Sequence, residues 1–139
     1  MWKVEIYRSR GIPDYNDVEV VIWVQTLAGI VKSRDLKMGA GFSYVDDDSA
    51  YATDNHQIAE DLVRCMHGFL AKIPEFKKVP TYIVGESYGG KMAAEFALLW
   101  YKHQQNGTII SNLKGVAFGD SWISPITIVG SWAPFLLNT

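Results

Sequence analysis

The order of apolar and polar residues along the chain predicts alternating strands and helices. Residues 18–24 are β-branched and nearly all apolar, which favours a strand covered on both faces of a parallel sheet. Residues 2–7 alternate and predict an edge strand, with a Gly- and Pro-containing turn over 11–17. From 53 or 54 to 72, apolar residues recur at steps of three and four and predict a helix with one apolar face.

The same alternation continues in the second half of the chain. Residues 80–84 predict a short buried strand, and Pro80 stands at its first position, where a missing N–H is tolerated. Residues 90–103 predict a second amphipathic helix, and 113–118 the next strand. This order favours right-handed βαβ units, and therefore an α/β fold with a doubly wound, mostly parallel sheet.

Composition narrows the class of protein. The 139 residues are 48% hydrophobic and 20% charged, which is typical of one ordinary globular domain and not of a disordered chain. The formal net charge is -2 and no block of five like charges occurs, so we expect neither nucleic acid nor a membrane as partner. Residues 1–6 lack the uninterrupted apolar stretch of a secretory signal, so we expect no signal peptide in this chain, and the single Cys65 cannot form an internal disulfide.

The residues that carry candidate chemistry form the sequence GESYG at 85–89, between the predicted strand and helix. A G-x-S-x-G turn in this context is a nucleophile elbow, in which a tight turn exposes the serine hydroxyl above the sheet. Ser87 is then the nucleophile, and the backbone N–H of Tyr88 faces a developing oxyanion at the start of the helix. The flanking glycines let strand and helix approach closely. The alternative is a glycine-rich turn that only joins the two elements.

Three blocks of sequence resemble the serine carboxypeptidase family: GAGFSYV at 39–45, GESYGGKMAA at 85–94 and GDSWISP at 119–125. They divide the chain into a divergent or truncated part, 1–38, and a family-like part, 39–137, of one incomplete α/β-hydrolase domain. The resemblance implies removal of C-terminal residues from peptides or proteins through a serine acyl-enzyme, without a cofactor or metal. It also implies a secreted or lysosomal setting.

Carried over to this sequence, the family pattern assigns Ser87 as nucleophile, Tyr88 N–H as oxyanion donor and Glu86 as a binder of the substrate's terminal carboxylate. Glu86 has a second interpretation, as an acid stabilised by the dipole at a helix N-terminus. Asn106 begins the sequon Asn-Gly-Thr and is a glycosylation candidate in a secretory lumen, or else part of a polar turn. Asp120 follows the nucleophile helix too soon to be the expected triad aspartate.

The sequence departs from the family pattern at the partners of Ser87. His103, the one histidine after Ser87, would lie about 24 Å along a continuous helix, and His56 and His67 precede the nucleophile. Residues 22–25 resemble the strand before a glycine-rich oxyanion loop, but that loop does not follow. We therefore expect a truncated chain without measurable carboxypeptidase activity. The alternatives are a non-catalytic binding or regulatory remnant of the fold, or an acyltransferase.

Overall fold

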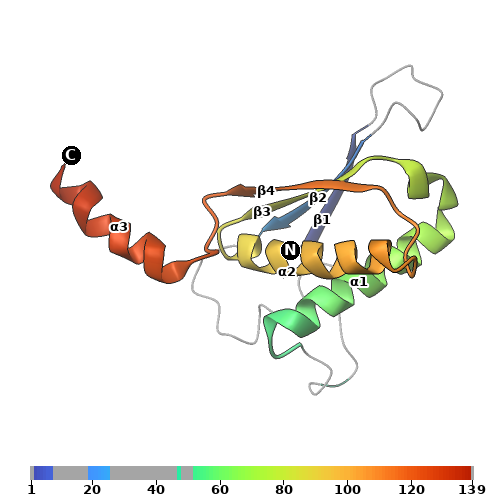
Figure 1. Cartoon of the computed structure of the whole chain (residues 1–139), viewed down its shortest axis with the longest axis horizontal. Helices are drawn as coiled ribbons and strands as arrows, with labels where there is room; N and C mark the ends of the chain where they lie inside the picture. The colour runs from blue at the N-terminus through green and yellow to red at the C-terminus, as the bar shows by residue number, and fades with distance from the viewer. Residues whose placement is uncertain (1, 8–18, 26–46, 48–51, 139) are drawn as a thin grey trace.

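A computed structural model describes residues 2–7, 19–25, 47 and 52–138 of the chain, and the predicted turn at 11–17 and the family block at 39–45 lie outside these ranges. Strands and helices alternate in the described part (Figure 1). In chain order the elements are β1 (Trp2–Tyr7), β2 (Glu19–Gln25), α1 (Asn55–Lys72), the 3-10 helix η3 (Pro74–Lys78), β3 (Thr81–Glu86), α2 (Tyr88–Gln105), β4 (Leu113–Gly119) and α3 (Pro125–Leu137).

The four described strands form one sheet in the order β1-β2-β3-β4. The first strand lies at one edge of the described sheet, as the sequence predicts, and it pairs antiparallel with β2. Strands β2, β3 and β4 are parallel to one another. Parallel neighbours require a long crossover, and α2 provides it between β3 and β4. The predicted α/β class with a mostly parallel sheet is confirmed.

The core lies between this sheet and helix α2, and α1 packs against α2 (Figure 1). From β2, Val20, Ile22 and Val24 are buried, whereas Val21 and Trp23 on the opposite face are only half-buried. The strand is therefore covered less completely on its second face than its apolar sequence predicts. Successive side chains of a strand point to opposite faces, so an apolar run can have unequal burial on its two sides.

Trp100 joins the core to the start of β4. Its side chain is completely buried, and its indole N–H donates to the Ser111 hydroxyl at 2.7 Å. Ser111 in turn donates to Gln104 Oε1 at 2.8 Å, and the same oxygen accepts the backbone N–H of Leu113 at 2.9 Å. A buried indole needs a partner for its N–H, and this chain of bonds supplies one while fixing where β4 begins.

Polar side chains cap the N-terminus of helix α1 and bind this helix to α2. Asp54 is its N-cap and accepts the backbone N–H of Gln57 at 2.8 Å, which explains why the helix begins where the sequence predicts. In the first turn, Asn55 Nδ2 donates to Glu95 Oε2 at 2.7 Å, and His56 Nδ1 lies 2.9 Å from Glu95 Oε1. These contacts fix α1 against the first half of α2.

Helix α3 was not predicted from the sequence. It begins with Pro125 in its first turn, a favoured position for proline, and projects away from the sheet (Figure 1). None of its side chains is buried, and Ile126 is 86% exposed. Its 13 residues contain no charged side chain. The sequence therefore lacks the polar face opposite an apolar stripe by which an amphipathic helix is predicted. Within the described ranges, no helix is long and apolar enough to cross a membrane.

Candidate active site

The connection between β3 and α2 is a single residue, Ser87. The strand continues to Glu86 and the helix begins at Tyr88, so both elements extend two residues closer to the serine than the sequence predicts. Ser87 has φ 56° and ψ −131°. A positive φ is uncommon outside glycine and costs about 1–3 kcal/mol, which the surrounding structure must offset. The tight strand-to-helix turn predicted for this serine is therefore present, and its backbone is strained.

Two glycines allow the turn to be this tight. A Cβ on Gly85 would lie 2.6 Å from the Cα of Gly90 and 2.8 Å from the Cβ of Ala93, closer than real atoms approach. A Cβ on Gly90 would overlap the side chain of Ser121. The sequence predicts the need for a small residue at Gly85. The need at Gly90 depends on a residue 31 positions further on, so no local pattern could reveal it.

The segment after β4 holds the elbow in place. The Ser87 N–H donates to the carbonyl of Gly119 at 3.4 Å, and the Trp122 N–H donates to the carbonyl of Ser87 at 2.9 Å. The hydroxyl of Ser121 donates to the carbonyl of Gly85 at 2.9 Å. The backbone on both sides of the strained residue is thus bonded to one neighbouring segment. This segment belongs to the family block GDSWISP at 119–125, but nothing in its sequence reveals that it supports the elbow.

Tyr88 and Glu86 flank the serine on the helix and strand sides. Tyr88 is the first helical residue, so its N–H has no partner within the helix and lies at the positive end of the helix dipole. Its ring is exposed, with Lys91 Nζ 5.6 Å from the ring centroid. Glu86 is half-buried, and the sheet register pairs it with Gln25 of β2 and Gly119 of β4. The elbow therefore lies where three parallel strands end, the usual position of sites in such sheets.

The described histidines lie on other parts of the surface. His56 contacts Glu95, His67 is exposed on α1, and His103 lies in the last turn of α2, 3.3 Å from the Thr108 hydroxyl. Asp120 follows β4 with φ 42° and is exposed. Among the residues that the structure describes, no cluster of His, Cys, Asp and Glu could hold a metal ion. The elbow thus has its nucleophile and a backbone donor, but none of these imidazoles hydrogen-bonds to Ser87.

Comparison with known proteins matches the elbow and its flanking elements. Residues 35–139 match the sequence model of the family described as serine carboxypeptidase. The chain belongs to the serine carboxypeptidase family. It is 51% identical over 116 residues to human retinoid-inducible serine carboxypeptidase, which covers 84% of this chain. It is 42% identical over 102 residues, 73% of this chain, to serine carboxypeptidase S10 family member 1 of Dictyostelium discoideum.

A third serine carboxypeptidase, the human protein named probable serine carboxypeptidase CPVL, is 35% identical over 114 residues, 82% of this chain. The matched regions make up 25%, 24% and 24% of these three relatives. The chain therefore spans about a quarter of the length of the serine carboxypeptidases it matches. The matched quarter includes the elbow, which is the part of the family fold that carries Ser87.

Proposed function

We propose that this chain carries the nucleophile of a serine-type carboxypeptidase, with Ser87 forming an acyl-enzyme during removal of C-terminal residues from peptides. The observation that supports this most directly is the backbone of Ser87, which adopts φ 56° between a parallel strand and a helix N-terminus. A serine has no packing reason to occupy a strained conformation, whereas a nucleophile gains an exposed hydroxyl from it. Family membership supplies the reaction class.

In the proposed reaction, the Ser87 hydroxyl attacks the carbonyl of the last peptide bond and transfers its proton to a base. The Tyr88 N–H, at the positive end of α2, donates to the oxyanion as it forms. None of the described histidines lies in position to be the base. We therefore assign base and orienting acid to parts of the family fold outside this chain, and we expect the 139-residue chain by itself to give no turnover.

The proposal is tested in a chimaera in which residues 39–137 replace the matching segment of human retinoid-inducible serine carboxypeptidase. A fluorophosphonate probe is expected to label the chimaera stoichiometrically at Ser87, because that reaction needs an activated hydroxyl. The isolated 139-residue chain is the matched control and is expected to stay unlabelled. A chimaera that folds and is secreted but does not react at Ser87 would contradict the proposal.

We further propose that Glu86 binds the terminal carboxylate of the substrate. It is the last residue of β3, half-buried and directly before the nucleophile. Glu86→Ala in the chimaera is expected to raise KM about tenfold or more with a smaller change in kcat, because one hydrogen bond to a charged group contributes about 1.5–3 kcal/mol to binding. The rate of fluorophosphonate labelling should remain unchanged, since the probe has no terminal carboxylate. Equal losses in labelling and in peptide hydrolysis would assign Glu86 to the elbow's structure instead.

A second candidate function is a non-catalytic binding protein that retains part of the hydrolase sheet. It is favoured by the exposed apolar residues at the end of the described sheet and on the last helix, namely Val116, Phe118, Ile126, Phe135, Leu136 and Leu137. Edge strands present unpaired backbone groups to which a partner strand can bind. If this second function is right, Ser87 should fail to react with the fluorophosphonate probe in the chimaera, as it does in the isolated chain. The labelling experiment therefore separates the two functions.

A further inference from the structure

The turn after α2 carries a sequon whose acceptor is open to solvent. Asn106 is the C-cap of α2, and its backbone N–H donates to the carbonyls of Lys102 and Gln104, while Gly107 turns the chain with φ 70°. Asn106 is exposed, and within the described part of the chain its side-chain amide makes no hydrogen bond. Nothing in the fold therefore requires an asparagine side chain here, and its amide is accessible to a glycan-transferring enzyme.

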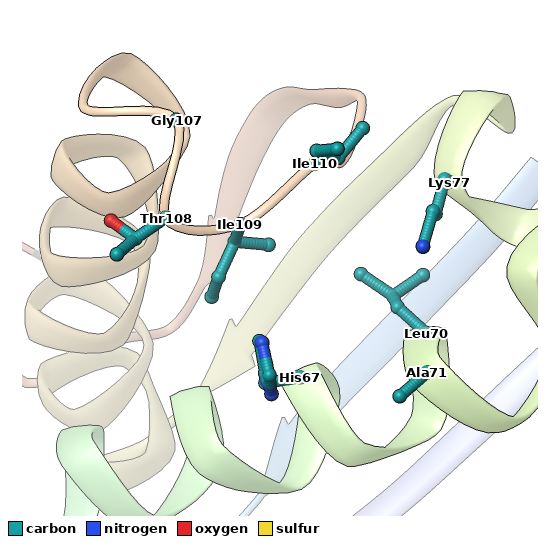
Figure 2. A pocket seen from close by; sticks show the side chains of 8 residues that line it. All are labelled: His67, Leu70, Ala71, Lys77, Gly107, Thr108, Ile109 and Ile110. Atoms are coloured by element: carbon teal, nitrogen blue, oxygen red, sulfur yellow. The ribbon is translucent and has the colours of Figure 1, made fainter.

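The two residues that complete the sequon line an open hollow of about 150 Å³ between α1, η3 and this turn (Figure 2). Figure 2 shows the side chains of His67 and Lys77 directed into it from opposite sides, with Leu70 between them. Since one water occupies about 30 Å³ of liquid, the hollow has room for about five waters, or for part of one sugar ring. Its lining combines the apolar side chains of Leu70, Ile109 and Ile110 with the nitrogen-bearing side chains of His67 and Lys77.

One apolar residue of the lining, Ile110, is exposed to solvent. Ile110 is 68% exposed although its neighbour Ile109 is buried, and both line the hollow. A sugar ring has an apolar face that can pack on Ile110 and Leu70, and hydroxyl and acetamido groups that can accept hydrogen bonds from Lys77. The sugar would be attached to Asn106, the residue directly before Gly107 in the lining of the hollow.

We propose that Asn106 is an N-glycosylation site and that the first N-acetylglucosamine of its glycan lies over this hollow. The donor is an oligosaccharide linked to a lipid diphosphate, as in the secretory lumen. A bond forms between Asn106 Nδ2 and C1 of the sugar, and the C1–O bond to the diphosphate breaks. The lipid diphosphate leaves with the electron pair, and Nδ2 loses one proton. The turn is 19 residues from Ser87, about 28 Å along α2, so the glycan leaves the elbow open.

Occupancy is tested with the whole 139-residue chain behind a cleavable secretory leader in mammalian cells. We expect a shift to lower electrophoretic mobility that peptide-N-glycosidase F reverses. Thr108→Ala and Asn106→Gln should remove the shift, while Thr108→Ser, the matched control, should keep it. Because transfer takes place during translocation, the result does not depend on how well each variant folds. A translocated chain without the shift overturns the proposal, whatever the reactivity of Ser87.

The position of the sugar over the hollow is tested by thermal unfolding of the glycosylated chain before and after enzymatic removal of the glycan. We expect the glycan to raise Tm by about 3 °C, the size of a single favourable contact in a chain of this length. Ile110→Ser and Lys77→Ala should reduce that difference without lowering occupancy, since both residues line the hollow. If the glycan leaves Tm unchanged, or if it raises Tm equally in both variants, the sugar does not lie over the hollow.

Discussion

Gly90→Ala is expected to lower the free energy of unfolding of this chain by about 3 kcal/mol or more, measured by urea denaturation. The new methyl group would overlap the Ser121 side chain, which lies on the segment that holds the elbow. Ser121 cannot rotate out of the way, because the overlap involves its Cβ and not only its hydroxyl. Either α2 or the segment after β4 must shift, and a shift separates the Ser121 hydroxyl from the carbonyl of Gly85.

The double variant with Ser121→Gly tests this cause directly. Ser121→Gly alone removes the bonds to the carbonyls of Gly85 and Gly119 and is expected to cost about 1 kcal/mol. In combination, the two changes should destabilise the chain by about 2 kcal/mol less than their sum, because the overlapping side chain is gone. The rescue should be partial, since the new methyl group would still lie 3.1 Å from the Cα of residue 121. Strictly additive effects would show that Gly90 is needed for another reason.

Gly68→Ala is the matched control, with the opposite expected sign. Gly68 lies in the interior of α1, is exposed, and a Cβ there would have no atom within 4 Å. Alanine in an exposed helix interior is expected to stabilise by about 0.5–1 kcal/mol over glycine. A loss of stability at both glycines would indicate that the chain's response to these substitutions is not set by local contacts.

How much of this fold the sequence predicts depends on the range of the interactions involved. The limits of α1 follow from signals within the segment itself, namely the Asp54 cap and the apolar period that ends near Lys72. Around the elbow, local preference misplaces the ends of β3 and α2 by two residues, because Gly85 and Gly89 favour neither element. Packing against the neighbouring strands and helices places Gly85 in β3 and Gly89 in α2. Helix α3 lacks the polar positions that would have revealed its period.

The candidate site likewise has a part that a local motif predicts and a part that depends on residues far away in the sequence. Glu86, Ser87 and Tyr88 are consecutive, so a motif of five residues is enough to single them out and to predict the tight turn. The support from Gly119, Ser121 and Trp122 comes from more than 30 residues away and depends on the register of β4 beside β3. The hollow beside Asn106 likewise joins α1, η3 and the turn after α2. Motifs can identify the chemical group, but the contacts that hold it require the fold.

Ser87→Ala in the chimaera with human retinoid-inducible serine carboxypeptidase is expected to lower kcat/KM for release of C-terminal residues by about 10⁴-fold to 10⁶-fold. The proposed mechanism assigns the acyl-enzyme to the Ser87 hydroxyl, which stands between the end of β3 and the start of α2, and alanine provides no nucleophile there. What remains should be the modest rate supported by substrate binding and by the backbone donor at the start of α2. Fluorophosphonate labelling should disappear in the same variant.

Two further measurements show whether this loss is chemical. Alanine at position 87 is expected to change the free energy of unfolding by no more than about 1 kcal/mol, since the Ser87 side chain makes no capping bond and both residues meet the same strain at φ 56°. Tyr88→Phe is the matched control, because it keeps the backbone N–H and should leave kcat/KM within about threefold. If Ser87→Ala stayed folded and retained turnover, the nucleophile would have to be another residue. If Tyr88→Phe were as inactive as Ser87→Ala, the phenol of Tyr88, and not only its backbone N–H, would take part in the reaction.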